Sequence, residues 1–144
     1  MRGIQISPEQ LQQMLQHVAH EAPIEACGLL GGSKSRVQQV VPITNAAESQ
    51  VRYRMDPSEQ VGALFGFEER GLELVAIYHS HPAGPPGPSS IDIREDAYPE
   101  ALQLIWFLEA GDWVCRAYRY GDSGAVEVPL GLGSGNEEHG GQDQ

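Results

Sequence analysis

The feature that most constrains this chain is an apolar run at residues 74–78 that leads directly into two histidines. The run reads Leu-Val-Ala-Ile-Tyr, which is typical of a strand buried on both faces. Such a strand needs other elements packed on each side of its sheet. His79 and His81 follow it, and because they are two residues apart on an extended chain, both imidazoles should point to the same side.

The segment after this strand should return a carboxylate to the histidines. Residues 82–88 are rich in Pro and Gly, and Ser89-Ser-Ile-Asp92 then begins a predicted helix. Two imidazoles and the Asp92 carboxylate would supply three ligands of a tetrahedral zinc, and an open fourth position is typical of a catalytic site. Taken alone, a His-x-His pair is often only a polar strand end, and Ser-x-x-Asp is also a capping box.

An earlier segment offers a candidate base. Glu25 lies among apolar residues at the start of a predicted strand at 24–32, where an ionised carboxylate is costly without a partner. A bound zinc would polarise a carbonyl and activate water, and Glu25 could move the water proton to the leaving amine. The Ser89 hydroxyl could donate to the oxyanion, with helix capping by Ser89 or Ser90 as the competing role. On this segment alone, Glu25 could also be a plain boundary residue.

Together these residues resemble the JAMM (MPN+) metalloprotease family. The family signature is His-x-His-Pro, six residues, Ser, two residues and Asp, and residues 79–92 match it. Residues 23–32 read Pro-x-Glu-x-x-Gly-Leu-Leu-x-Gly, similar to the family segment that carries the catalytic glutamate, so the match falls on Glu25 and not on Glu21. The resemblance extends from the first predicted helix to a strand near Tyr120.

This resemblance implies a zinc peptidase that cleaves after the C-terminal Gly-Gly of a ubiquitin-like protein. It assigns His79, His81 and Asp92 as metal ligands. Glu25 and Ser89 become the catalytic residues. The strings Glu-Ala-Cys-Gly, Thr-Asn-Ala, Tyr-Arg-x-Asp and Tyr-His-Ser-His are most similar to stand-alone bacterial members, among which one removes cysteine from a ubiquitin-like sulfur carrier.

The expected partner is therefore a ubiquitin-like sulfur carrier protein, from which the enzyme would release cysteine or an attached amine. Two alternatives stay open: an isopeptidase acting on other ubiquitin-like conjugates, as deubiquitinases do, and a non-catalytic MPN scaffold. Such scaffolds typically lack the zinc ligands that this chain has. A zinc nucleoside deaminase, which is also an α/β protein, stays open as a further class, although its His-x-Glu and Pro-Cys-x-x-Cys strings are absent from the sequence.

The remaining pattern predicts an α/β fold, a mixed β-sheet flanked by helices, of the JAMM/MPN (cytidine deaminase-like) type. Ser7-Pro-Glu-Gln10 predicts a helix start, and an apolar stripe continues to about Glu21. His17 and His20 lie off this stripe, and we expect them to face solvent. Strands are predicted at residues 3–6 (as an edge strand), 24–32, 36–43, 51–55, 74–78, 102–108, 113–120 and 125–130. A second helix should run from Asp56 to Gly71 with Val61, Leu64 and Phe65 facing inward.

Length and charge limit the classes of partner. At 144 residues the chain should form one domain, at residues 1–130, and residues 131–144 are Gly-rich, acidic and expected to be disordered. A formal net charge of -11 with nine Lys and Arg argues against nucleic acid. No apolar run suits a membrane span or signal peptide, so we expect a cytoplasmic protein without a membrane partner. Its two cysteines are interpreted as small core residues.

Overall fold

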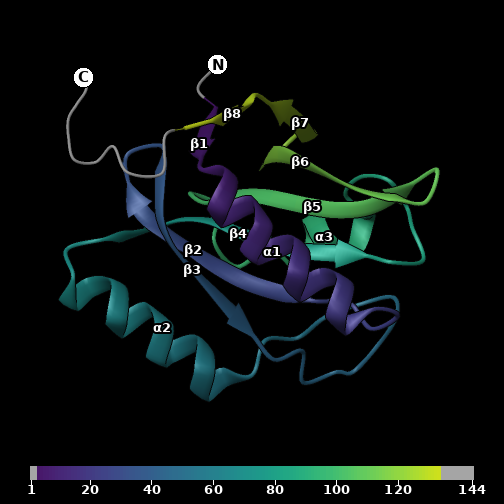
Figure 1. Ribbon diagram of the computed structural model, residues 1–144, viewed down its shortest axis with the longest axis horizontal. Helices are drawn as coiled ribbons and strands as arrows, with labels where there is room; N and C mark the ends of the chain where they lie inside the picture. Colours follow the sequence, from purple (N-terminus) through teal and green to yellow (C-terminus); the bar gives the residue numbers. More distant parts are fainter. Residues whose placement is uncertain (1–2, 134–144) are drawn as a thin grey trace.

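Strand β4 (Glu73–His81) lies in the middle of an eight-stranded mixed sheet, as the apolar run predicts (Figure 1). The structure, a computed structural model, describes residues 3–133. β4 pairs antiparallel with β2 (Cys27–Ser33) and parallel with β5 (Leu102–Glu109). All β4 residues from Val75 onward are buried, because helices or loops cover the sheet on both faces.

The other strands extend the sheet in both directions, in the order β7-β6-β5-β4-β2-β3-β1-β8. Their bounds are β1 (Ile4–Ile6), β3 (Arg36–Ile43), β6 (Asp112–Gly121), β7 (Gly124–Val128) and β8 (Leu130–Leu132). The predicted α/β class, a mixed sheet with flanking helices, is confirmed.

Helix α1 (Pro8–Glu21) covers one face of the sheet and begins where the sequence predicts (Figure 1). Ser7 Oγ accepts a hydrogen bond from Gln10 N at 3.1 Å, and Gln10 Oε1 accepts one from Ser7 N at 2.9 Å. This reciprocal pair satisfies two backbone donors that the first helical turn leaves free. Met14 and Val18 are fully buried against sheet residues such as Tyr78.

Helices α2 (Pro57–Glu69) and α3 (Ser90–Arg94) cover the opposite face. Phe67 of α2 packs in one cluster with Ile77 of β4, and Ile93 of α3 packs against Ile105 of β5. Side chains alternate along a strand, so Ile77 and His79 share this face, whereas Tyr78 faces α1. The histidine pair is therefore directed toward the α2 and α3 side of the sheet.

Helix α2 is rotated relative to the prediction. Val61 and Phe65 were expected to face inward, but they are exposed, at 51% and 62%. Leu64 packs inward as predicted, and Ala63 and Phe67 do so in place of Val61 and Phe65. The sequence of this stretch is apolar on several sides of the helix, so periodicity alone does not define its buried face, and packing against β2 and β4 selects it.

Residues 51–55 do not form the predicted strand. The segment makes a single isolated bridge, between Asn45 and Met55. Its backbone is bonded to residues of the preceding turn: Ala46 N donates to Arg54 O at 2.7 Å, and the Asn45 side chain contacts the segment as well. These contacts take the place of a neighbouring strand.

The strands near the two ends of the chain also differ from the prediction. β1 was predicted as an edge strand, but it lies between β3 and β8, with Ile4 opposite Leu130 in a parallel pair. The predicted domain limit at residue 130 therefore falls inside β8, which continues to Leu132. The remainder of the predicted tail, residues 134–144, lies outside the described residues. Within residues 3–133, no helix is long and apolar enough to cross a bilayer.

Candidate active site

Two imidazoles and one carboxylate meet where β4 ends. His79 Nε2 and His81 Nε2 are 3.1 Å apart, and Asp92 Oδ2 lies 3.2 Å from the first and 3.0 Å from the second. Both histidines are buried, with at most 2% exposure. Asp92 is thus separated from the histidines in sequence but lies beside both of them in the structure, as the motif predicts.

A capping box at α3 aims the Asp92 carboxylate. Ser89 Oγ accepts a hydrogen bond from Asp92 N at 3.0 Å, and Ser89 N donates back to Asp92 Oδ2 at 2.9 Å. The oxygen that contacts the histidines is therefore also held by the helix start. Ser89 is the N-cap residue, and its hydroxyl, which accepts in this bond, still has a proton to donate.

Strand pairing brings Glu25 to the same place. Ala26 N donates to Ser80 Oγ at 2.8 Å, and Ser80 N donates to Ala26 O at 3.0 Å, so the start of β2 is attached to the end of β4. The Glu25 carboxylate and the ring nitrogens of His79 and His81 consequently lie within 4.8 Å of one another. Glu25 is only 2% exposed.

The Glu25 carboxyl is in an unusual electrostatic environment. Burial raises the pKa of Glu25 to about 7, the nearby Asp92 charge raises it as well, and His81 lowers it. Its Oε1 is buried without a hydrogen-bond partner among the residues that the structure describes. A buried carboxylate with a free oxygen and a pKa near neutrality can accept or release a proton at physiological pH.

The histidines and Asp92 fit a divalent metal. A tetrahedral zinc with bonds of about 2.0–2.1 Å separates its ligand atoms by about 3.3 Å. The three observed distances, 3.0–3.2 Å, are close to that value. His81 Nδ1 lies 2.9 Å from Pro85 O, so a proton on Nδ1 would leave the Nε2 lone pair facing the cluster.

The charge of Asp92 supports the same fit. Burial by itself would raise the pKa of Asp92, but hydrogen bonds from His79 and His81 outweigh burial and keep it well below its usual value. The side chain therefore stays anionic, as a carboxylate that binds a metal must. Asp92 contacts both imidazoles at hydrogen-bond distance, whereas Glu25 joins them only within the wider 4.8 Å grouping, so the distances favour Asp92 as the third ligand.

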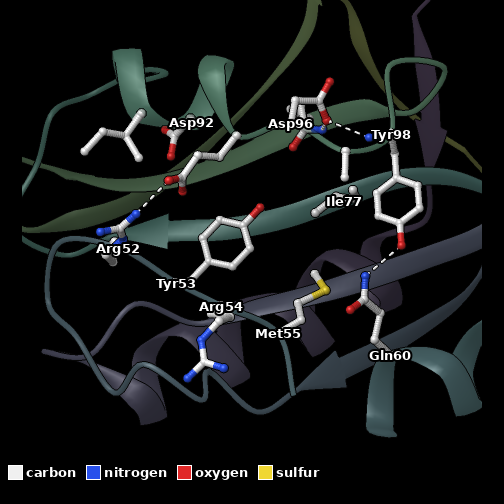
Figure 2. Close-up of a pocket in the computed structure, with 13 residues that line it drawn as sticks. Arg52, Tyr53, Arg54, Met55, Gln60, Ile77, Asp92, Asp96 and Tyr98 are labelled. Carbon is white, nitrogen blue, oxygen red and sulfur yellow. Dashed lines mark hydrogen bonds and ion pairs between the residues drawn. The ribbon is translucent and has the colours of Figure 1, made fainter. Parts of the chain in front are cut away.

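A groove of about 240 Å³ opens beside this cluster (Figure 2). Asp92 lines it at the cluster end, Ile77 lies beside Tyr98, and Tyr53, Met55 and Tyr98 form apolar walls. Several polar side chains also line it, among them Arg52, whose Nη2 lies 2.7 Å from Glu95 Oε2, and Gln60, which donates to Tyr98 Oη at 2.7 Å.

The structure brings all five predicted site residues together: Glu25, His79, His81, Ser89 and Asp92. His17 and His20 on α1 are not part of the cluster. His20 is exposed, but the expectation that His17 faces solvent was wrong. His17 is half-buried, and its Nδ1 lies 2.7 Å from Tyr78 Oη on the α1 face of the sheet.

Two further residues at the site were not predicted. The Tyr53 ring stacks on His79, with ring centroids 4.7 Å apart and an angle of 28° between the planes. Asn45 is buried and bonds to the backbone of Glu25. Both residues belong to strings that the sequence analysis singled out, Thr-Asn-Ala and Tyr-Arg-x-Asp, but spacing alone assigns them no role.

Comparison with known proteins agrees with this geometry. A family model described as Prokaryotic homologs of the JAB domain matches residues 7–120. The chain belongs to this JAB family. The match includes every residue of the cluster, and the resemblance to JAMM proteins is confirmed.

Individual relatives of this JAB-domain chain carry more specific names. It is 32% identical to a CysO-cysteine peptidase of Mycobacterium tuberculosis, over 88% of this chain and 89% of that protein. It is 40% identical to a desampylase of Pyrococcus furiosus, over 62% of this chain but only 64% of the relative. A solution structure of a protein from Desulfitobacterium hafniense is 34% identical, has a TM-score of 0.84 and covers 94% of this chain and 97% of its own.

Proposed function

We propose that this chain is a zinc peptidase that cleaves after the C-terminal Gly-Gly of a small ubiquitin-like sulfur carrier protein. His79, His81 and Asp92 would hold the zinc, with Glu25 as the base. The observation that carries this proposal is the contact of Asp92 Oδ2 with both imidazoles, at 3.0 and 3.2 Å, beside a buried glutamate with a free oxygen. Such a donor set suits zinc and leaves a coordination position open for catalysis.

The protein side chains then have separate tasks. Zinc, when bound, polarises the scissile carbonyl and makes water more acidic. Glu25 accepts the proton of the attacking water and passes it to the leaving amine, for which a pKa of about 7 is suitable. Ser89 donates its hydroxyl proton to the developing oxyanion while the same oxygen still accepts the cap bond from Asp92 N.

The side on which the carrier binds follows from the proton path. Glu25 must reach the leaving nitrogen, so the leaving group lies on the Glu25 side of the metal. The groove is lined by Tyr53 and Asp92 and, among the described residues, not by Glu25. We therefore assign the groove to the acyl side, where the tail of the carrier approaches (Figure 2).

Glycine suits the last positions of that tail. The last carbonyl of the tail must reach the metal site near His79, Ser89 and Glu25, and a terminal glycine brings no Cβ that could clash there. The names of two relatives, a CysO-cysteine peptidase and a desampylase, support a small protein modifier as substrate. These names do not fix which group is released. Experiment must decide between free cysteine and the amine of a lysine side chain.

The test uses small ubiquitin-like proteins that end in Gly-Gly, each prepared in two forms. One form carries cysteine in peptide linkage after the last glycine, and the other is joined to a lysine side chain of a model peptide. We expect the zinc-loaded enzyme to release the carrier with a free Gly-Gly end from at least one form, detected by intact mass spectrometry. No cleavage of either form, from any carrier of the same genome, would contradict the proposal.

A single change in the carrier tests the steric argument. Replacing its last glycine by valine should abolish cleavage without unfolding the carrier, because a branched side chain cannot pass the three residues around the carbonyl. Efficient turnover of this valine carrier would refute the narrow approach while leaving the peptidase assignment intact.

A further inference from the structure

The Asn45 side chain lies at the centre of the active-site framework. It is buried, with 6% exposure, and uses its whole hydrogen-bonding capacity. Its Nδ2 donates to Glu25 O at 3.0 Å and to Arg52 O at 3.2 Å. Its Oδ1 accepts from Ala47 N and from Arg54 N, both at 3.0 Å. An amide that makes four bonds to backbone groups cannot be replaced by a carboxylate or an apolar side chain without losing some of them.

These bonds connect two segments that carry site residues. One segment contains Glu25. The other contains Tyr53, which lies between Arg52 and Arg54, and Asn45 bonds to the backbone of both of these neighbours. Because the backbone on both sides of Tyr53 is anchored, the direction of its Cα–Cβ bond is fixed, which limits where its ring can lie. That ring stacks on His79, with centroids 4.7 Å apart (Figure 2 shows Tyr53 beside the groove).

His79 depends on this packing more than His81 does. His81 Nδ1 lies 2.9 Å from Pro85 O, a contact that can orient its ring. His79 Nδ1 is buried and has no hydrogen-bond partner within residues 3–133. Metal-binding histidines are normally oriented by a hydrogen bond at the second ring nitrogen. The His79 ring contacts Asp92 through Nε2, and the stacked Tyr53 ring restricts its rotation in place of a hydrogen bond at Nδ1.

We propose that Asn45 is a positioning residue of the metal site. It holds the Tyr53 ring against His79 and, through the same amide, holds the Glu25 backbone beside it. This inference rests on the metal site of the proposed function. It assigns a physical role to the Thr-Asn-Ala and Tyr-Arg-x-Asp strings, whose side chains neither touch the substrate carbonyl nor bind the metal.

The test measures how fast the zinc-loaded protein loses its metal to an excess of chelator, which requires no substrate. Loss of an orienting partner typically weakens metal binding by about 10–100-fold, so we expect Asn45→Ala to release zinc at least about tenfold faster than the wild type. Tyr53→Leu should accelerate release to a similar extent. In the double variant, release should be within about twofold of the faster single variant, because both changes act through one ring.

Two control variants separate positioning from general destabilisation. Val128→Ala removes buried volume in β7, at the far edge of the sheet, and Thr44→Val removes the hydroxyl that donates to Glu59 next to Asn45 in sequence. Both should release zinc at the wild-type rate. Tyr53→Phe keeps the ring and should also release zinc slowly.

The outcomes distinguish this inference from the proposed function. If folded Asn45→Ala and Tyr53→Leu both release zinc no faster than Val128→Ala, the positioning role is refuted, although the peptidase assignment stands. If the two substitutions had additive effects on the zinc release rate in the double variant, Asn45 would not act through the Tyr53 ring, and the inference would likewise be refuted. A wild-type protein that takes up no zinc would overturn the metal site and this inference together.

Discussion

Glu21 and Glu25 are four residues apart, yet only one of them can serve as a buried base. Glu21 ends α1 beside the exposed His20. Glu25 is buried, and burial raises its pKa to about 7. The chemical difference between the two carboxyls therefore arises from desolvation rather than from residue type.

We predict that Glu25→Gln retains the metal and the fold but lowers kcat by about a hundredfold or more, because an amide cannot accept the water proton. Turnover of the cysteine-linked or lysine-linked carrier, measured beside zinc content, checks this. Glu21→Gln is the matched control and should have wild-type turnover. If the Glu25 variant were near normal, the base would have to be another group.

The ligand assignment has its own test. His81→Ala should remove the metal, because it deletes one of three donors and leaves the other two without a complete set. Zinc content after purification, determined by atomic absorption, should fall from about one equivalent to a small fraction. One full equivalent in the variant would show that His81 is not a ligand.

Elements on opposite faces of the sheet both act on the end of β4. α3 supplies Asp92 on one face, and on the other α1 contacts β4 through His17 Nδ1 and Tyr78 Oη, 2.7 Å apart. Tyr78 is directly followed by His79, so the α1 contact supports the strand where the proposed metal ligands begin. Gly28 makes room for this tyrosine, since a Cβ there would lie 2.2 Å from the Tyr78 ring.

This contact predicts a pH dependence of stability. Burial lowers the pKa of His17, with Glu21 raising it to a smaller extent. The unfolded chain therefore binds a proton at His17 near pH 6.5, where the folded protein does not, so stability should decrease as pH falls below about 6.5. Urea unfolding of wild type and His17→Gln at pH 7.5 and 5.5 checks this. The wild type should lose more stability than the variant, and equal losses would contradict the role of His17.

At the scale of the whole molecule, the site joins segments that are distant in sequence. Glu25 lies just before β2, both histidines are on β4, and the aspartate is on α3. Asn45 bonds to the backbone of Glu25 and of Arg52 in the same region. A ligand that binds only this assembled arrangement must stabilise the folded state.

We accordingly expect zinc removal to lower Tm. Saturation at 100 times Kd stabilises a protein by about 2.7 kcal/mol, which corresponds to roughly 5–10 °C for a domain of this size. Thermal unfolding with zinc and with chelator measures the difference. His81→Ala should show no such difference, and an equal shift in that variant would mean that zinc stabilises the protein at another site.

The sequence by itself determined the features that depend on neighbouring residues. The buried strand before His79, the capping boxes at Ser7 and Ser89 and the span of β3 follow from local periodicity and from hydrogen bonds within one helical turn. The metal motif belongs to this class, because a strand end and a helix start place its donors within one continuous segment.

Tertiary structure alone decided the features that depend on distant partners. The buried face of α2, the pairing of β8 with β1, the half-buried position of His17 and the bond from Asn45 to Glu25 O all join segments far apart in the chain. An apolar stretch without a clear period has several possible buried faces, and a buried amide can satisfy its hydrogen bonds in many ways. Only the packed sheet selects one of them.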